Sequence, residues 1–483
     1  MGVTRTRTAL AAVLLAVAVS ASAADCVTDY RLVSERGILP NRPAGPSAWN
    51  GSVLAVARIV PGNPVVFSRY DANLNHIGDS VVTSSAAGTG PAILLAGGGD
   101  FGLLFTASSG AITFQQINAA GIRTGGEVQI GASHGTFPNQ EYDAAYNAFR
   151  DRWEIVYTVT NTADFGLWVT SIPAHAQQGN ALIDQRVQFF LSEQATPRIA
   201  VTANGTVAIS WFRPVNNVST LFVGFYDPSW LPFASILVTT TAESESPRLA
   251  TNGTSFALVY QSPISGGTEL RWLRFDAAGR VTNADARLLV GSGIDIVPVH
   301  FLWSGSLSEW ALSYIDATFG LNTFPGDYRL RRINASGALI SDVLFTPDLT
   351  KSLISGQHNV TWNGAAYVGS IERFFSREEG SDSYLVKHCP LLGSIKVDSP
   401  AAPVIFQPFT FTASANGGLP PYKFSWDFGD RSELRTETSF THAYQHTGTY
   451  TVTLTVTDSF GDKAVQSRTV VVVDSVRRRP TKR

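Results

Sequence analysis

A phrase that recurs along the chain constrains its fold more than any other feature. The segments "TANGTVAISWF" (residues 202–212) and "ATNGTSFALVY" (residues 250–260) each place Asn-Gly before an alternating apolar run, and they lie about 48 residues apart. Asn-Gly pairs recur at residues 50–51 and 363–364, and Ser304-Gly305 stands in an equivalent context. Asn-Gly between apolar runs predicts β-hairpins with type I′ turns, in which both central residues have φ > 0.

Each copy of the phrase belongs to a longer unit of four predicted strands. A short apolar segment such as "PRIAV" or "PRLA" precedes it, and a third strand, a second turn and a fourth strand follow. The clearest second turns are "DAAGR" (residues 276–280) and "NASGA" (residues 334–338). Four antiparallel strands in a repeat of about 50 residues are typical of β-propeller blades.

The unit recurs seven times, and the last unit is incomplete. After "SYLVKHC" no fourth strand precedes Pro390, whereas a spare strand, "VTDYRLVS", lies at residues 27–34. We expect this strand to complete the last blade, because closure of the ring removes exposed sheet edges. The sequence therefore predicts an all-β fold, with a seven-bladed β-propeller over residues 26–390. Six to eight blades are compatible with the repeats, and a pair of β-sandwiches is the alternative.

The first residues have the pattern of an export signal. A basic start precedes the apolar run "ALAAVLLAVAVSA", and "ASAAD" supplies a small-residue cleavage site, so residues 1–23 are a predicted bacterial Sec-type signal peptide. No other apolar stretch approaches bilayer length, and the formal net charge of −2 creates no field that would attract nucleic acid. We expect a secreted or periplasmic monomer without a membrane span.

Export and ring closure together predict a disulfide bond between the two cysteines of the chain. Cys26 precedes the spare strand, and Cys389 ends the third strand of the last unit. Antiparallel pairing of these strands would bring both residues within the Cα separation that a disulfide needs. An oxidising compartment favours the bond, and two unrelated buried thiols are the alternative.

The composition changes after "CPLLGS", where alternating runs such as "TYTVTLTVTD" predict a small antiparallel sandwich over residues 395–475. "YKFSWDFGD" followed by "FTHAYQHTGTYTVTLTVTDSFGD" closely resembles a PKD (polycystic kidney disease) domain, which has an immunoglobulin-like fold. The resemblance implies a spacer or binding module without catalytic residues. It also implies that Trp426 fills the core and that Asp427, Gly429 and Asp430 shape a turn.

Two further details belong to this resemblance. It implies an inward-facing row of Tyr450, Val452, Leu454 and Val456. Arg431 departs from the family, which usually has glycine at this position, so the shape of the turn is open. The basic residues 476–483 are expected to form a disordered tail.

No motif assembles a catalytic centre or a metal site. "GASHG" (residues 131–135) matches G-x-S-x-G, but no helix is predicted after it, so a loop coincidence is preferred to a Ser133 nucleophile. His442 and His446 lie on a strand-and-loop segment, where a shared metal is not expected. Asp427 and Asp430 could join a Ca²⁺ site, although turn formation also explains them. We expect neither a cofactor nor a metal.

Two long loops form the predicted ligand-binding surface. "DATFGLNTFPGD" (residues 316–327) and "ERFFSREEGSDS" (residues 372–383) follow the second strands of neighbouring units, and long loops on a rigid scaffold are disproportionately functional. Aromatic rings beside carboxylates suit a sugar or a basic peptide, whereas phenylalanines that pack back onto the blades are the alternative. The candidate residues are Phe319, Phe324, Phe374, Phe375, Glu378, Glu379 and Asp382.

These features favour a secreted, non-catalytic binding or adhesion protein that recognises carbohydrate or protein at the cell surface. In this interpretation the propeller is the binding scaffold and the C-terminal domain is an interaction or spacer module. The alternative is a polysaccharide-degrading glycoside hydrolase or lyase, whose paired carboxylates about 5–10 Å apart would come from different blades. A third possibility is a structural subunit of an envelope assembly.

Overall fold

The computed structural model describes residues 29–37, 45–132, 141–159, 166–174, 183–188, 196–216, 218–239, 247–291, 294–318, 326–345, 353–354, 359–376, 380–398, 403–459 and 461–474. The named elements in these ranges are all β-strands, which confirms the predicted all-β class. Within them, no helix is long and apolar enough to span a membrane.

Strands β1–β29 form seven sheets within the described ranges, and six of these sheets contain four strands that follow one another along the chain. The first sheet contains β2 (Ser47–Trp49), β3 (Leu54–Arg58), β4 (Val66–Tyr70) and β5 (His76–Val81). The second contains β6 (Ala87–Gly97), β7 (Asp100–Ala107), β8 (Ile112–Ile117) and β9 (Val128–Gln129). The third contains β10 (Tyr142–Asn147), β11 (Arg152–Val159), β12 (Gly166–Pro173) and β13 (Ile183–Gln188).

The next three sheets repeat this order. The fourth contains β14 (Arg198–Val201), β15 (Val207–Val215), β16 (Val218–Tyr226) and β17 (Pro232–Thr239). The fifth contains β18 (Arg248–Thr251), β19 (Ser255–Ile264), β20 (Gly267–Asp276) and β21 (Ala286–Val290). The sixth contains β22 (Ile294–Ser304), β23 (Glu309–Thr318), β24 (Gly326–Asn334) and β25 (Leu339–Leu344).

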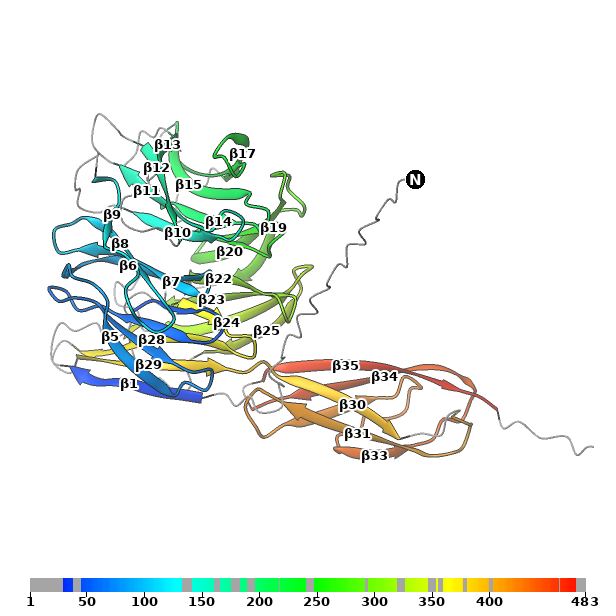
Figure 1. The fold of residues 1–483 in the computed structure, drawn as a ribbon. Helices are drawn as coiled ribbons and strands as arrows, with labels where there is room; N and C mark the ends of the chain where they lie inside the picture. Colours follow the sequence, from blue (N-terminus) through cyan, green and yellow to red (C-terminus); the bar gives the residue numbers. More distant parts are fainter. Residues whose placement is uncertain are drawn as a thin grey trace, which may run out of the picture.

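The seventh sheet joins the two ends of this series. It contains β27 (Asn359–Trp362), β28 (Tyr367–Ser376), β29 (Gly380–His388) and β1 (Asp29–Gly37), with β26 (Leu353–Ile354) on the far end of β28. β1 pairs antiparallel with β29, and Asp29 lies opposite Lys387 (Figure 1). The prediction that an N-terminal strand completes the last sheet is therefore confirmed.

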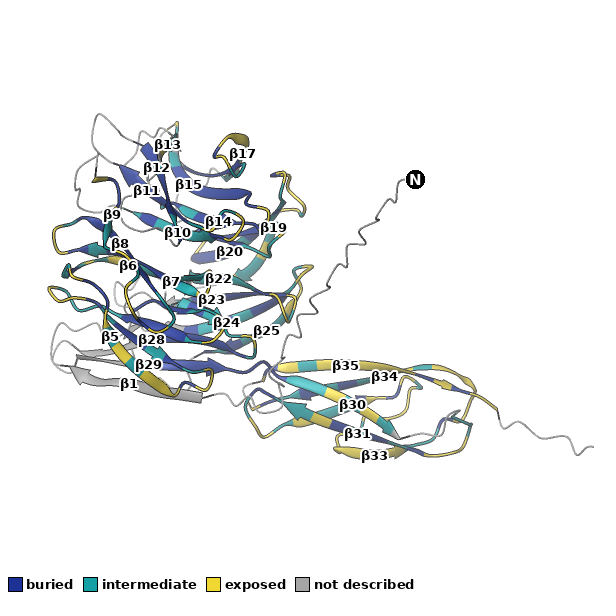
Figure 2. Cartoon of the chain, in the orientation of Figure 1, coloured by how far each residue is buried: buried dark blue, intermediate teal, exposed yellow. Residues whose placement is uncertain are grey.

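The first strands of the seven sheets contact one another in succession. β2 contacts β6, and the series continues through β10, β14, β18 and β22 to β27, which contacts β2 again. Aromatic side chains fill the space between adjacent sheets, as where Phe67 packs against Phe101 with ring centroids 5.2 Å apart. Figure 2 shows that burial concentrates on the inner strands, whereas outer strands such as β5 are more exposed. This propeller-like arrangement explains why the inner strands are apolar on both faces.

The Asn-Gly turns differ from the predicted type I′ geometry. Asn50, Asn252 and Asn363 each begin a four-residue loop, and positive φ occurs at the glycine but not at the asparagine. Each asparagine Oδ1 instead accepts two backbone N–H groups from later residues of the loop, at 2.7–3.0 Å. The type I′ prediction was wrong because the asparagine side chain, rather than a left-handed backbone, closes these turns.

The C-terminal residues form a sandwich of two three-stranded sheets. One sheet contains β30 (Leu392–Asp398), β31 (Phe409–Asn416) and β33 (Ser439–His442). The other contains β32 (Lys423–Asp427), β34 (Gly448–Thr457) and β35 (Lys463–Val472).

The core of this sandwich agrees with the residues implied by the sequence motif. Trp426 is completely buried, and Val452, Leu454 and Val456 face the same core, with Tyr450 packed at its edge. The core therefore forms where alternating residues of β32 and β34 face β31 of the other sheet.

The turn after β32 is shaped by its aspartates. Asp427 Oδ1 accepts the Gly429 N–H at 2.8 Å, and Asp430 Oδ1 accepts the Ser432 N–H at 3.0 Å. Arg431 adopts φ of 69°, a conformation that glycine accommodates more easily. This explains why the substitution of arginine for the usual glycine leaves the turn intact: the backbone keeps the left-handed conformation.

Candidate functional site

The residues of the predicted loop surface are only partly within the described ranges. Phe319 and Phe324, like Glu378 and Glu379, lie outside them. Phe374 and Phe375 belong to β28, and Asp382 belongs to β29. Their role in ligand binding stays a prediction.

The second of the two predicted loops is mostly a strand pair. The ladder between β28 and β29 continues from Glu372 opposite Ser383 to Ser376 opposite Gly380, which leaves only residues 377–379 between the strands. The prediction of a loop over residues 372–383 was wrong, because backbone hydrogen bonds extend the hairpin through a segment whose polar side chains suggested a loop. In the first loop, Ala317 still pairs with Gly326, so residues 319–325 connect the strands.

Cys389 is completely buried at the end of β29, while Cys26 lies outside the described residues. The disulfide therefore stays a prediction. Ser133 also lies outside the described residues.

A row of equivalent positions on the first strands offers a second candidate site. Each of these residues lies opposite the same position of the second strand in its own sheet, so all seven are structurally equivalent. We call this set the inner row; its members are Ser47, Ile93, Asp143, Arg198, Arg248, His300 and Asn359. Six of the seven are polar, although they lie on strands that are otherwise largely apolar.

Several inner-row side chains bond the first strand of the following sheet. Asp143 Oδ2 accepts the Ile199 N–H at 3.0 Å, and Arg248 Nε donates to the Val299 carbonyl at 2.5 Å. Asn359 accepts from the Ser47 N–H at 2.6 Å and donates to the Ser47 carbonyl. These bonds hold consecutive first strands together, so part of the inner row has a structural role.

Arg198 and Arg248 are the cationic part of the inner row, and they lie close to groups with shifted pKa values. Burial, together with the neighbouring charge of Arg198, lowers the pKa of Arg248 to about 9. Burial and the charge of Arg248 lower the pKa of His300 to about 4, so this imidazole is neutral at pH 7. Burial raises the pKa of Asp143, against the attraction of Arg198 and Arg248.

Sequence reasoning did not identify the inner row as a site. Arg198 and Arg248 stand within the repeated "PRIAV" and "PRLA" segments, so the repeat already placed them at equivalent positions. The signal that could have found them is a charged residue inside an apolar inner strand.

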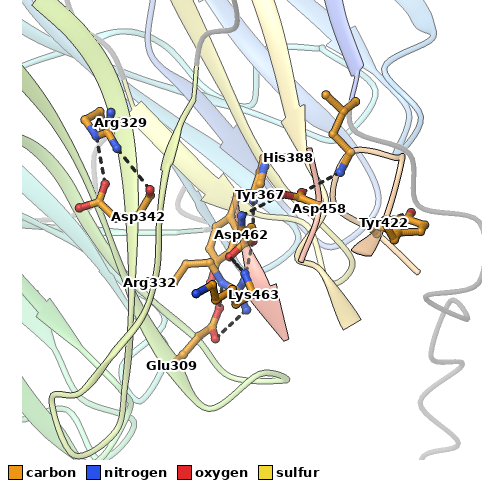
Figure 3. A network of polar contacts seen from close by, with 12 residues as sticks. Glu309, Arg329, Arg332, Asp342, Tyr367, His388, Tyr422, Asp458, Asp462 and Lys463 are labelled. Carbon is orange, nitrogen blue, oxygen red and sulfur yellow. Dashed lines mark hydrogen bonds and ion pairs between the residues drawn. The ribbon is translucent and has the colours of Figure 1, made fainter. Parts of the chain in front are cut away.

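A third polar cluster lies where the N-terminal sheets meet the C-terminal sandwich (Figure 3). Arg332 on β24 binds Glu309 on β23 with two hydrogen bonds, of 2.7 and 3.1 Å, and Tyr367 on β28 donates to Glu309 at 2.6 Å. From the sandwich, Asp462 places a carboxylate oxygen 3.5 Å from Arg332 Nη1 and 3.9 Å from His388 Nε2. These five residues are at most 4% exposed, and we call them the junction cluster.

The connection between the two parts of the chain is also buried. Only residues 389–391 separate β29 from β30, and Leu391 already belongs to the core of the sandwich. The Gly418 N–H donates to the Cys389 carbonyl at 2.7 Å, and a Cβ on Gly417 would lie 2.0 Å from the Pro390 carbonyl oxygen. The sandwich is thus packed directly against the end of β29.

Burial controls ionisation in the junction cluster. It raises the pKa of Asp462 despite the attraction of Arg332, and it lowers the pKa of His388 to about 3 with the help of the Arg332 charge. His388 and Asp462 therefore do not form an ion pair at pH 7, because His388 is neutral. The positive charge beside Asp462 belongs to Arg332.

The described residues contain no group of three or more His, Cys, Asp or Glu side chains that could hold a metal ion. Asp430 is instead engaged by His442, whose Nε2 lies 2.8 Å from its Oδ2 and whose ring stacks on Phe428. Partial burial would raise the pKa of Asp430, but hydrogen bonds from Ser432 and His442 outweigh it and lower this pKa. These contacts agree with the turn-forming interpretation of Asp430.

The comparison with solved structures returns distant likenesses. The Dos1 propeller is 9% identical, over 73% of this chain and 94% of its own, with a TM-score of 0.43. The six-bladed β-propeller lectin of the fungus Aleuria aurantia is 13% identical, over 59% of this chain and 88% of its own, with a TM-score of 0.37. The PKD1 domain of Vibrio anguillarum Epp is 22% identical, over 18% of this chain and 98% of its own, with a TM-score of 0.16.

The comparison with curated protein sequences returns no match. Among protein families, the PKD domain matches residues 390–473, which include all six strands of the sandwich. The C-terminal part of this chain is therefore a PKD domain, as its sequence motif predicts.

Proposed function

We propose that the seven N-terminal sheets are the blades of a seven-bladed β-propeller closed by β1, and that this propeller is the scaffold of an extracellular binding protein. The contact series of the first strands, which returns from β27 to β2, supports the closed ring. The proposal keeps a signal peptide at residues 1–23, the propeller at 26–390, the PKD domain at 395–475 and a basic tail at 476–483.

The observation that carries the binding function is the cationic part of the inner row. Arg198 and Arg248 are anchored on adjacent first strands, yet both side chains remain only partly buried and keep contact with solvent. Fixed hydrogen-bond donors on a rigid scaffold suit recognition of a polar ligand. Carbohydrate is the ligand class to test first, and an extracellular protein is the second.

A non-catalytic role is favoured by the carboxylates of the inner row. Asp143 is its one acidic member, whereas glycosidases generally use two carboxyl groups that flank the scissile bond. A glycoside hydrolase or a lyase would need further acidic groups from other parts of the chain.

Binding and turnover can be separated with the purified, exported protein. We expect a glycan array to reveal stable binding, and we expect the bound polysaccharides to remain unchanged in size and in reducing ends after prolonged incubation. Release of reducing ends or of unsaturated products would contradict the non-catalytic proposal and favour the hydrolase or the lyase.

The predicted loop surface has its own test. Phe324→Ala combined with Phe374→Ala should abolish binding of a glycan found on the array, because aromatic faces commonly stack on sugar rings. Phe233→Ala is the matched control, since Phe233 is 49% exposed on the outer strand β17 of the fourth sheet. Unchanged affinity in the double variant, with an intact thermal transition, would exclude this surface.

A further inference from the structure

We propose that Arg198 and Arg248 form a binding site for a carboxylate group, and that the ligand class is an acidic sugar. This inference rests on the proposed binding function and deepens it. The hydrogen bonds of these two arginines to backbone carbonyls do not fully explain why two cations lie in the inner row, and the proposed site gives them a role.

The two arginines are placed for joint recognition by the repeat itself. Arg198 pairs with Ser210 and Arg248 pairs with Val259, which are equivalent register positions, and their strands β14 and β18 contact each other. Equivalent positions put both side chains on the corresponding side of neighbouring sheets. The two guanidinium groups are also close enough for the charge of Arg198 to disfavour the charged form of Arg248.

Among the described residues, both guanidinium groups have N–H donors beyond those that bind backbone carbonyls. Arg198 donates from Nη1 to the Pro197 carbonyl at 2.7 Å, and Arg248 donates to the carbonyls of Pro247 and Val299. Within the described ranges neither forms an ion pair with a carboxylate, and the oxygen Oδ2 of nearby Asp143 accepts a backbone N–H instead. Two like charges held close together repel each other, and an anionic ligand would relieve that repulsion.

The shape of the donors selects the anion. The planar guanidinium fork matches the two oxygens of a carboxylate. Within the carbohydrate class proposed above, the chemical group with these properties is the carboxylate of a uronic acid.

Titration calorimetry with sodium glucuronate, at constant ionic strength and pH 7, tests the site directly. Glucose and sodium acetate are the comparison ligands. We expect glucuronate to bind, glucose not to bind measurably, and acetate to bind more weakly than glucuronate. Equal binding of glucose and glucuronate would overturn the carboxylate site, and equal binding of acetate and glucuronate would overturn the assignment to a sugar acid.

Variants distinguish the site from a general effect of charge. Arg198→Gln should weaken glucuronate binding by about tenfold to a hundredfold, the range expected for a lost charge-assisted hydrogen bond. Arg280→Gln removes the same charge from an exposed turn and should leave binding unchanged. Retained affinity in Arg198→Gln would overturn the proposal.

A variant that binds more tightly gives a result that misfolding cannot produce. Asp143→Asn removes a carboxyl group that competes with the ligand for the arginines but keeps an acceptor for the Ile199 N–H, so glucuronate should bind several times more tightly. Weaker or equal binding by a folded Asp143→Asn protein would count against the site. If neutral glycans bind the wild type and Arg198→Gln equally and neither protein binds glucuronate, the proposed function stands while this inference is overturned.

Discussion

Asparagine and aspartate side chains shape the turns of this chain as much as its glycines do. In five sheets, the turn between the third and fourth strands starts with an Asx residue whose Oδ1 accepts two backbone N–H groups: Asp71, Asn118, Asp227, Asp276 and Asn334. Three residues later φ is positive, at Leu74, Gly121, Trp230, Gly279 and Gly337 respectively. Leu74 and Trp230 are almost completely buried, and this burial offsets the cost of a left-handed backbone.

The first prediction concerns one of these turns. Asn334→Ala should lower the free energy of unfolding by about 1–2 kcal/mol, because the N–H groups of Ser336 and Ala338 lose their acceptor. Asn334→Asp keeps the acceptor oxygen and should stay close to the wild type. Urea unfolding measures both, and equal losses in the two variants would show that the side-chain oxygen does not stabilise the turn.

At the scale of the elements, the turn glycines also determine how closely adjacent sheets pack. A Cβ on Gly279 would lie 2.8 Å from the ring of Phe225, and one on Gly337 would lie 2.4 Å from the ring of Trp272. In each case the aromatic residue belongs to the preceding sheet. The repeat therefore has glycine at these turns both for a left-handed backbone and for contact between neighbouring sheets.

The second prediction separates these two requirements. Gly337→Ala places a side chain on a residue with a φ of 100° and also brings its Cβ against the Trp272 ring. Gly266→Ala places one on a residue with a φ of 77°, with nothing within 4 Å of the new Cβ. Gly266→Ala should cost about 1 kcal/mol, and Gly337→Ala should cost clearly more. Thermal unfolding of the pair measures the difference. Equal unfolding temperatures for the two variants would mean that the sheets can move apart for the new Cβ without loss of stability.

At the scale of the whole molecule, the junction cluster joins the PKD domain to the sheets. Arg332 connects Asp462 of the PKD domain to Glu309, and Glu309 in turn accepts from Tyr367 of the seventh sheet. The connection of residues 389–391 is buried as well. These buried contacts hold the PKD domain in one orientation relative to the N-terminal sheets, which a flexible spacer would not do.

The third prediction follows from the buried histidine of this junction. The folded pKa of His388 is about 3 and that of an exposed histidine is about 6.5, so below about pH 6.5 the unfolded state binds a proton that the folded state excludes. The stability contributed by neutral His388 is present above about pH 6.5. It is lost toward pH 3 at up to about 1.4 kcal/mol per pH unit.

His388→Gln should therefore reduce the acid sensitivity of unfolding between about pH 4.5 and pH 7. The raised pKa of Asp462 acts in the opposite direction, because its folded form takes up a proton more readily, but Asp462 is present in both proteins. His446→Gln, at an exposed position, is the control. Parallel pH profiles for wild type and His388→Gln would refute the assigned role of His388.

The fourth prediction is the disulfide between Cys26 and Cys389. The register of β1 and β29 supports it, since Asp29 lies opposite Lys387, and in the sequence these residues are three and two positions from Cys26 and Cys389 respectively. Closure of a loop of this length corresponds to about 5–6 kcal/mol in an entropic treatment of the unfolded state. Non-reducing peptide mapping should recover the two cysteines in one linked peptide, and free thiols in exported protein would contradict the bond.

The fold was more predictable from the sequence than the candidate site was. The repeat predicted four-stranded units, and the PKD motif identified Trp426 and the inward row of β34, because both depend on local periodicity and turn residues. The prediction of a loop over residues 372–383 also relied on local composition, and it was wrong. Polar side chains do not prevent backbone hydrogen bonds from extending a strand pair. The inner row was missed because its seven members are spread over residues 47–359 and meet only when the sheets assemble.

The sequence by itself determined the strands, their order within each sheet and the presence of the PKD domain. These depend on interactions between neighbours in the chain, and the chain repeats them every 50 or so residues. Tertiary structure alone decided which charges came together, including the pairing of Arg332 with Asp462, which are far apart in sequence. The physical reason is that pKa shifts and charge pairing depend on burial and on distances through space, neither of which a local pattern contains.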